Sequence, residues 1–479
     1  MSKKISLAIA LVGLCALSLL LLSCGSSSSR PSGVLYVLTQ GSNGVGNNVT
    51  SFAIDLNSGN LSLVNSNAST CPTAATPTNT EPCGLPLDLL LDPTGATAFI
   101  LNQGTPCVQQ GNQCVGAGNI LPILPSIYPY TVNSDGSLSA PGTVVNWTTS
   151  ADTAVAMARD AAGQFLFVID QGVYPPPTTC PAIGTATQSF PGCPSITVFV
   201  MKPGSTTLTV ASQFFLSKTP SALSPITFTP SGSTTAQELL FVTNNYDLCT
   251  VGCVPASPPS VSTVSVYAVS STGVLSEQPN SPYAISASDP VSVQAVNTNP
   301  AGKNTGGLFV YVGQGGSVGA VYPFEVCTVV GNAVCSQQQV TENLLFPLST
   351  CPLLSCMVPP SSVGADPVAM LVDPTNNFLY VMSKGQSQVS AFQINTTAGK
   401  LTALSPPNLP TGSQPVAMAM HASVNAVGQA LYSSSGQFLY TSNSGSSNIT
   451  GFSLSTTTGT MSPPFTVSSP AEPSGIAVH

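Results

Sequence analysis

Four short segments rich in branched and aromatic residues follow one another between residues 366 and 404. They read PVAMLV, FLYVM, QVSAFQI and KLTAL, and the turn sequences DPTN, KGQS and NTTAG separate them. Segments of this length, parted by Gly, Asn, Asp and Pro, predict four successive β-strands. The pattern recurs along the chain, and this recurrence predicts an all-β repeat protein.

Seven copies of this unit can be traced in the sequence. The first unit spans residues 34–64 and lacks a first strand, whereas the last residues, EPSGIAVH at 472–479, match a first strand alone. One unit shared by both ends of the chain leaves no exposed sheet edge. The sequence therefore predicts a closed seven-bladed β-propeller over residues 33–479, with four-stranded antiparallel blades and the C-terminal strand completing the first blade. The other units start at Leu85, Ala154, Ser224, Asp289, Asp366 and Gln414.

The N-terminal residues resemble the signal of a bacterial lipoprotein. A lysine pair precedes an apolar run up to Leu22, and Leu-Leu-Ser leads directly into Cys24. We expect residues 1–23 to be a signal peptide and residues 24–32 to be a Ser-rich tether that begins with the lipidated Cys24. The alternative is a membrane-spanning helix, because the apolar run is nearly long enough to span. Gly25, in place of an aspartate, favours the outer membrane, on its periplasmic or outer surface.

Composition and charge exclude several classes of function. Only 5% of residues are charged, beside 41 Gly and 43 Pro, which argues against long charged helices, and a hydrophobic share of 42% is too high for a disordered chain. Without the predicted signal, seven Lys and Arg stand against 17 Asp and Glu. No basic patch is available for nucleic acid. The expected partners are a membrane, through the lipid anchor, and an envelope protein or glycan, and we expect a monomer.

Twelve of the 14 cysteines fall into six close pairs once Cys15 and Cys24 are set aside. Every pair lies in a stretch rich in Pro, Gly and Asn between predicted strands, which favours local disulfides in an exported protein. Metal binding is the alternative, but the chain has two histidines and no CxxC. The predicted pairs are Cys71 with Cys83, Cys107 with Cys114, Cys180 with Cys193, Cys249 with Cys253, Cys327 with Cys335 and Cys351 with Cys356.

The phrases FLYVMS, FLYTSN and LLFVTNN resemble the YVTN repeat of the lactonase family of seven-bladed propellers, the relatives of bacterial 6-phosphogluconolactonase. The resemblance extends over residues 33–479. It implies the propeller fold and an enzyme that opens a sugar lactone with His, Arg and Glu side chains at the channel mouth. This chain departs from that pattern, because Arg159 is its only arginine beyond the tether and its histidines are His421 and His479. A phosphorylated sugar would need several cations, so 6-phosphogluconolactone is not the expected substrate.

One position of the predicted first strands is mostly small, as expected where seven strands converge on one axis. In the second unit this position holds Asp88, which either faces the channel and binds a cation or substrate, or is solvated or bonded to the backbone. His421 lies at the end of a first strand and is either a turn residue or a general base. The small residues are Ala156, Ala369, Ala417, Ser292 and Gly475.

A calcium site is a further candidate, although we expect no cofactor. Asp88, Asn102, Asp170 and Asn244 lie near the predicted channel-facing ends of strands and offer the oxygen ligands that calcium prefers. Asn and Asp are equally ordinary turn formers. No GxSxG, HExxH, Walker or dinucleotide-binding motif occurs in the sequence.

Two functions are compatible with these features. Five of the six predicted disulfide loops would lie on one face of the propeller, which favours a non-catalytic binding or scaffolding module in the cell envelope. The alternative is a lactonase-like hydrolase that opens a neutral or lipophilic lactone at the axial channel, with Asp88 and His421 as its catalytic candidates. The scarcity of Arg and His favours the binding module, and the family resemblance favours the hydrolase.

Overall fold

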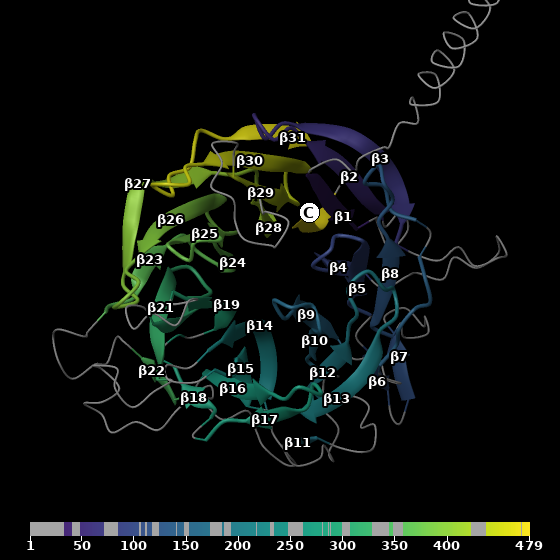
Figure 1. Ribbon diagram of the computed structural model, residues 1–479, viewed down its shortest axis with the longest axis vertical. Helices are drawn as coiled ribbons and strands as arrows, with labels where there is room; N and C mark the ends of the chain where they lie inside the picture. Colours follow the sequence, from purple (N-terminus) through teal and green to yellow (C-terminus); the bar gives the residue numbers. More distant parts are fainter. Residues whose placement is uncertain are drawn as a thin grey trace, which may run out of the picture.

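The repeats fold into seven β-sheets arranged as blades around a central axis (Figure 1). In this computed structural model the inner strands of neighbouring blades contact one another all the way around the ring. The predicted seven-bladed propeller is confirmed. The structure describes residues 33–40, 48–70, 85–104, 107–110, 113–116, 124–139, 141–147, 153–172, 184–185, 193–216, 218–229, 234–247, 262–279, 281–285, 287, 289–298, 307–327, 344–347, 358–422, 437–470 and 472–479.

Each blade runs outward from an inner strand near the axis. Blade 1 contains β32 (Pro473–Val478), β1 (Val34–Thr39), β2 (Asn48–Ile54) and β3 (Leu61–Ser69). Blade 2 contains β4 (Pro86–Leu91), β5 (Thr97–Asn102) and β8 (Ser126–Thr131), and blade 3 contains β9 (Ala154–Arg159), β10 (Phe165–Asp170), β12 (Ser195–Val200), β13 (Thr209–Phe215) and β11 (Gly184–Thr185). Blade 4 contains β14 (Lys218–Phe228), β15 (Gln237–Asp247), β16 (Thr263–Val269), β17 (Leu275–Glu277) and β18 (Tyr283–Ala284).

The remaining blades follow the same order. Blade 5 contains β19 (Pro290–Asn297), β20 (Leu308–Gln314), β21 (Gly319–Cys327), β22 (Leu344–Pro347) and β23 (Ser361–Val363). Blade 6 contains β24 (Pro367–Val372), β25 (Phe378–Ser383), β26 (Gln388–Ile394) and β27 (Leu401–Pro410), and blade 7 contains β28 (Pro415–His421), β29 (Gln437–Asn443), β30 (Asn448–Leu454) and β31 (Phe465–Ser468). A separate hairpin, β6 (Cys107–Gln110) and β7 (Gln113–Gly116), branches from blade 2.

Blade 1 joins the two ends of the described chain. The C-terminal strand β32 pairs antiparallel with β1, and Val34 and His479 exchange backbone hydrogen bonds of 3.2 and 2.9 Å. Figure 1 shows the C-terminus beside β1, at the inner edge of the blade. The predicted closure by the last eight residues is confirmed, and it leaves the buried strand β1 with a partner on each side.

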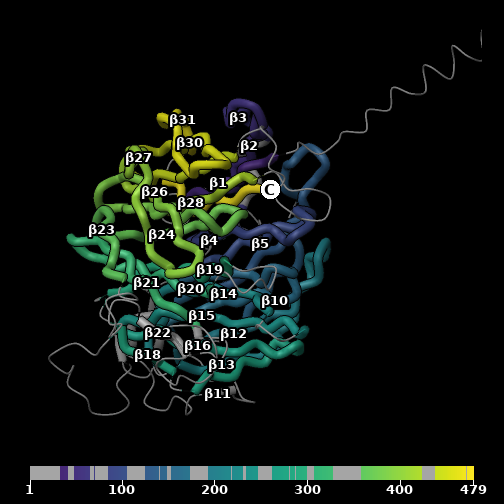
Figure 2. Tube along the Cα trace, turned by 60° about the vertical axis from the view of Figure 1, so that its left-hand side comes forward, coloured from purple at the N-terminus to yellow at the C-terminus, as the bar shows by residue number. Residues whose placement is uncertain are grey.

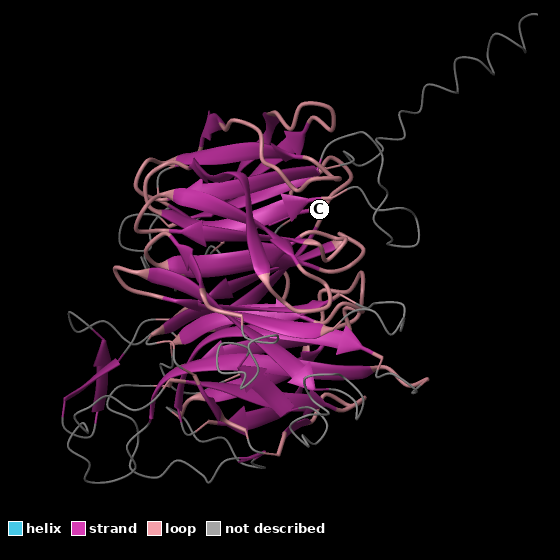
Figure 3. Cartoon of the chain, turned by 90° about the vertical axis from the view of Figure 1, so that its left-hand side faces the viewer, coloured by secondary structure: helices cyan, strands magenta, loops and turns pink. Residues whose placement is uncertain are grey.

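The blades stack side by side around the axis when the molecule is turned (Figures 2 and 3). Their facing surfaces are packed with the apolar residues that alternate along the strands, as in the cluster of Leu35, Val37, Phe438 and Tyr440 between blades 1 and 7. In the described part of the chain, which is built of strands and turns, no helix has the length and apolarity required to cross a membrane.

Several blades depart from four regular strands, and the sheets of blades 3, 4 and 5 contain five each. The sheet of blade 2 has three strands, and an isolated bridge between Ile127 and Val145 lies at its outer edge. In blade 4 the inner strand β14 begins at Lys218, although the sequence predicted its start at Ser224. That prediction was wrong because the turn-like sequence around Pro220 is a bulge within the strand, where the register with β15 shifts.

Tyrosines in the second strands of blades 5, 6 and 7 make hydrogen bonds to the following blade. The hydroxyls of Tyr311, Tyr380 and Tyr440 donate hydrogen bonds of 2.8–2.9 Å to the carbonyl oxygens of glycines in the next blade. The acceptors are Gly399, Gly459 and Gly59, each in a turn between third and fourth strands. Blades 2, 3 and 4 have Phe99, Phe167 and Phe241 at the equivalent position and lack this bond. In these three blades, the tyrosine of the YVTN repeat therefore joins neighbouring blades through a hydrogen bond.

We expect Tyr440→Phe to lower the free energy of unfolding by about 1 kcal/mol, because it leaves the buried Gly59 carbonyl without its donor. Chemical denaturation followed by the fluorescence of Trp147, the single tryptophan, measures this. The control is Tyr322→Phe, since Tyr322 is only partly buried. Equal stability losses in the two variants would contradict a special role for the bond that crosses from blade 7 to blade 1.

Candidate functional site

The inner strands share one local geometry at their N-terminal ends. Each has a proline or an alanine at or near its start, followed by a bulged residue and then by the residue that the sequence aligned with Asp88. The register confirms this alignment, because Asp88 pairs with Leu101 just as Ala369 pairs with Met382 and Gly475 with Leu38. Blade 4 contributes Ala222, which pairs with Thr243. Asp88 is therefore the one acidic residue in a ring of small side chains.

Serine hydroxyls link these strands around the axis. Ser474 Oγ donates to the Pro86 carbonyl of the next blade at 2.7 Å, and Ser221 Oγ donates to the Pro290 carbonyl at 2.6 Å. Ser292 Oγ, one position further along its strand, donates to the Pro367 carbonyl of the next blade. In each case a serine near the N-terminal end of one inner strand contacts a proline near the N-terminal end of the next. The inner strands therefore run parallel to one another. The second-to-third and blade-to-blade connections consequently lie on one face, and the first-to-second and third-to-fourth connections, most of them short turns, lie on the other.

A cavity of about 520 Å³ opens along the inner strands of blades 3 to 6 and reaches Asp88 in blade 2. Its wall combines apolar groups, such as Met157 and Met370, with the polar side chains of Ser292 and Gln294. This size lies within the range of pockets that hold small molecules. The cavity is the axial site that the sequence predicted.

Asp88 is held in the wall of this cavity by backbone groups. One carboxylate oxygen accepts a hydrogen bond from its neighbour Leu89 N at 2.8 Å, and the other accepts one from Met157 N of blade 3 at 3.3 Å. Burial among the blades opposes ionisation more strongly than these two bonds favour it, and it raises the pKa of Asp88 to about 6. Such a carboxylate is ionised at neutral pH but can accept a proton readily.

Arg159 brings a positive charge to the same cavity. It lies at the end of β9, and its guanidinium donates to the carbonyl oxygens of Leu91 at 2.8 Å and Asp160 at 3.1 Å. Burial lowers the pKa of this guanidinium, and the carboxylates of Asp160 and Asp92 partly offset the effect. An arginine remains protonated under such conditions. Among the described residues that line the cavity, one carboxylate and one guanidinium are the only charged groups.

The other residues of the predicted calcium site lie elsewhere. Asn102, Asp170 and Asn244 lie at or near the ends of the second strands of blades 2, 3 and 4, and all three are buried within their own blades. Asp170 accepts a hydrogen bond of 2.7 Å from Ser195 Oγ of the adjacent strand. They do not converge with Asp88, and within the described residues no group of three His, Cys, Asp or Glu side chains is placed to hold a metal.

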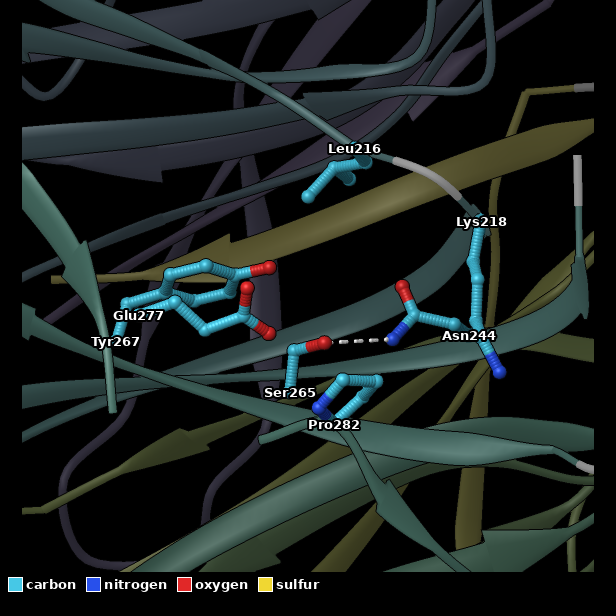
Figure 4. A pocket seen from close by; sticks show the side chains of 7 residues that line it. All are labelled: Leu216, Lys218, Asn244, Ser265, Tyr267, Glu277 and Pro282. Carbon is cyan, nitrogen blue, oxygen red and sulfur yellow. Dashed lines mark hydrogen bonds between the residues drawn. The ribbon is translucent and has the colours of Figure 1, made fainter. Parts of the chain in front are cut away.

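Asn244 borders a separate cavity of about 10 Å³, enough for one water molecule (Figure 4). Its amide nitrogen donates to Ser265 Oγ at 3.1 Å, while its buried carbonyl oxygen has no hydrogen-bond partner. Tyr267 and Glu277 lie across the cavity from Asn244 in Figure 4. The Asn244 side chain therefore links two strands of its own blade and does not line the axial cavity.

The two histidines also lie away from the axial cavity. His421 is buried at the end of β28, beside Phe438 and against Gly33. His479 ends the chain over Gly95 of the turn that follows β4. His421 is thus a packed residue between blades 7 and 1, and the geometry does not place it where a base for the channel would lie.

Three of the predicted disulfides involve cysteines that the structure places at least in part. Cys193 is buried and disulfide-bonded, but its predicted partner Cys180 lies outside the described residues. The hairpin of β6 and β7 places Cys107 and Cys114 on paired strands, where Cys107 faces Gly116 and Cys114 faces Gln109. Cys327 ends β21, whereas its predicted partner Cys335 lies outside the described residues.

The other three predicted disulfides and the lipidation site lie wholly outside the described residues. Their pairing, and the attachment of a lipid, therefore stay predictions from the sequence. The cysteines concerned are Cys24, Cys71, Cys83, Cys249, Cys253, Cys351 and Cys356.

Sequence reasoning overlooked two features of the site. The sequence analysis gives Arg159 no role in the site, but its position three residues after Ala156 on a first strand places it in the same cavity wall. Ala222 is absent from the predicted set of small residues because it precedes Ser224, the predicted start of unit four. The recurring Pro-x-small pattern at the start of first strands, here Pro220-Ser221-Ala222, would have revealed the correct register.

The comparisons with known proteins agree with this architecture. Residues 370–473 match the family model described as lactonase, 7-bladed beta-propeller. No curated protein matches the chain significantly in sequence.

Several solved structures share the fold over nearly the whole chain. A candidate 6-phosphogluconolactonase from Bacteroides uniformis is 12% identical, with a TM-score of 0.55, and covers 93% of this chain and 99% of its own. The periplasmic gluconolactonase PpgL from Pseudomonas aeruginosa is 15% identical, with a TM-score of 0.52, and covers 93% of this chain and 98% of its own. A candidate 6-phosphogluconolactonase from Bacteroides fragilis is 13% identical, with a TM-score of 0.52, covering 95% and 99%. At such identities the likeness establishes the fold.

Proposed function

Residues 370–473 carry the signature of the lactonase seven-bladed propellers, and from this premise we propose that the axial cavity hydrolyses an uncharged lactone. The observation that carries the proposal is Asp88, a single carboxylate in a cavity of about 520 Å³ with its pKa raised to about 6. Fold likeness alone would not assign an activity, because propellers host many functions. The carboxylate of Asp88 and the guanidinium of Arg159, both in the wall of this cavity, supply the chemical argument.

Asp88 has the properties of a general base for this reaction. Its carboxylate takes a proton from a water molecule, whose oxygen attacks the lactone carbonyl carbon. The ring C–O bond then breaks, and the proton passes from Asp88 to the leaving alkoxide oxygen, so that a hydroxy acid is released. Arg159 supplies the positive charge that stabilises the oxyanion formed during the attack.

The cavity wall argues for an uncharged or lipophilic substrate. Met157, Leu223 and Met370 line it, and Arg159 is the only cation among its described residues. A phosphoryl group binds best where several cations or backbone donors converge. We therefore propose an aliphatic or unphosphorylated sugar lactone in preference to 6-phosphogluconolactone.

We place this activity in the cell envelope. The proposal rests on the lipoprotein-like N-terminus with Cys24, together with the disulfide bond of Cys193, since structural disulfides form in oxidising compartments. The long connections on one face remain a proposed surface for an envelope protein or glycan.

A pH-stat assay of the purified protein tests the function. We expect acid release from aliphatic or sugar lactones, and kcat/KM should rise about tenfold per pH unit below the pKa of Asp88, near pH 6, and level off above pH 7. 6-Phosphogluconolactone, the charged comparison, should be turned over far more slowly. The proposal would be overturned if no lactone released acid faster than the uncatalysed rate. That result would favour the alternative function, a non-catalytic binding module.

A further inference from the structure

Arg159 is a half-buried cation in the wall of the axial cavity. Its Nε atom donates to the Leu91 carbonyl oxygen at 2.8 Å, and its Nη1 atom donates to the Asp160 carbonyl oxygen at 3.1 Å. Both acceptors are neutral, and within the described residues no carboxylate forms an ion pair with this guanidinium. A charge that is partly removed from water and has no counter-charge is unfavourable, so an anion from solution would stabilise it.

The two carboxylates that act on this guanidinium are held by backbone groups. Asp92 accepts a hydrogen bond from Gly204 N at 2.7 Å, and Asp160 accepts one from Phe165 N at 2.7 Å. Burial lowers the pKa of Arg159, and these two carboxylates offset only part of that effect. They stabilise their own turns and leave the guanidinium able to bind a further anion.

The second terminal nitrogen of Arg159, Nη2, is open for such a contact. It makes no hydrogen bond within the described residues, and it is not one of the buried polar atoms that lack a partner. Nη2 is therefore accessible. The cavity that Arg159 lines has a volume of about 520 Å³, which is ample for a short organic acid.

We propose that the axial cavity binds a small monocarboxylate anion on Arg159 and that ionisation of Asp88 expels it. The carboxylate accepts hydrogen bonds from the guanidinium, a charge-assisted contact. Lactone hydrolysis releases a hydroxy acid, which is an anion of this class. The extension to inhibition by the product rests on the proposed function, whereas binding of the anion requires no turnover.

Asp88 controls the charge of the same cavity. It lies on β4 three residues before Leu91, whose carbonyl oxygen holds Arg159, and three residues of a strand span about 10 Å. An anion on Arg159 that extends into the cavity approaches Asp88 to less than this distance. Like charges at such separations repel appreciably in a partly dry cavity. Protonation of Asp88 removes the repulsion and leaves Arg159 as the only charge in the described lining.

The strands that pack against β4 carry no second acid. β5 and β32 have no ionisable side chain, β1 has Tyr36, and β9 has Arg159. Asp88 is thus the group in this part of the cavity wall whose charge changes near pH 6. The ionisable groups just beyond the ends of these strands are Asp92, Asp160 and Glu472.

The affinity for the anion should therefore fall as the pH rises through the pKa of Asp88, which burial raises to about 6. We expect Kd to be about tenfold higher at pH 7.5 than at pH 5. At neutral pH the site would admit an uncharged lactone and release the hydroxy acid. In an acidified medium the product would stay bound, so that the acid released by turnover would slow further turnover.

Isothermal titration calorimetry of the purified protein with 4-hydroxybutyrate, the hydrolysis product of γ-butyrolactone, tests the inference. The uncharged probe is 1,4-butanediol, and at pH 5 we expect the anion to bind at least about tenfold more tightly. Asp88→Asn should bind 4-hydroxybutyrate at pH 7.5 about as tightly as the natural protein does at pH 5. Arg159→Gln should lose the preference for the anion at both pH values. The control is Lys202→Gln, which removes an exposed cation from a turn of blade 3.

Equal binding of 4-hydroxybutyrate and 1,4-butanediol at pH 5 would overturn the inference, as would unchanged anion binding in Arg159→Gln. An affinity of the natural protein that does not vary with pH would refute the role of Asp88. Circular dichroism verifies the fold of each variant. Lactone turnover without anion binding would sink this inference alone, whereas anion binding without turnover of any lactone would sink only the proposed function.

Discussion

A chain that ends at residue 471 is expected not to fold at room temperature. The deletion removes β32 and with it the inner strand of blade 1, so that β1 becomes an open edge. Leu35, Tyr36, Val37 and Leu38 are fully buried and would lose one neighbouring strand. The lost pairing and burial amount to roughly 5–10 kcal/mol, which equals the whole stability of a typical domain. The far-UV circular dichroism spectrum and thermal melting of the truncated protein measure this.

Removal of eight residues at the other end is the matched control. Residues 25–32 precede the first described residue, Gly33, and deleting them should leave the melting temperature unchanged. A synthetic peptide of residues 472–479 should restore folding of the truncated chain by strand addition, whereas the same peptide with Ile476→Asp should not. A truncated chain that melts like the full protein would show that the ring does not depend on its closing strand.

Asp88→Asn is expected to lower lactone turnover by about 100-fold or more, because the variant has no general base in the axial cavity. The substitution keeps the size of the side chain and one oxygen, which can accept the hydrogen bond from either Leu89 N or Met157 N. The measurement is kcat in the pH-stat at pH 7.5. The control is Asp135→Asn, which makes the same change in an exposed turn of blade 2 and should keep full activity.

The same variant should be more stable than the natural protein at neutral pH. The pKa of Asp88 is about 6 in the folded state and 3.8 in the reference state, so the folded state holds its proton more tightly. Stability is therefore highest below about pH 4 and falls as the pH rises through 6. Asp88→Asn removes this cost, about 1–3 kcal/mol at pH 7.5 and nothing at pH 4. A variant that gains no stability at pH 7.5 would contradict the unfavourable burial of the charge.

The fold could be predicted from sequence because its signals are local. In the turn after each first strand, Asp92, Asp160 and Asp373 accept backbone N–H groups, and Gly95, Gly163 and Asn376 adopt positive φ. These residues recur at fixed spacing and mark the strand pairs. The closing strand was predictable for the same reason, since Glu472 and Pro473 repeat the start of other first strands.

The sites were only partly predictable, because they depend on contacts between distant residues. Asp88 could be recognised as the exception among small residues. Asn102 and Asn244 were predicted to help form a calcium site but are buried within their own blades. A sequence pattern does not show whether a side chain points to the axis or into its own blade.

Because both ends of the described chain meet in blade 1, their position determines which face of the propeller a lipid anchor would turn towards a membrane. Gly33 and His479 lie on the face of the short turns, beside His421 and Gly95, at the opposite end of the strands from the long connections. A lipid on Cys24, nine residues before Gly33, would thus hold the short-turn face towards the bilayer. The strand ends that lead into the second-to-third and blade-to-blade connections would then lie away from the membrane, on the side that partners in solution could approach.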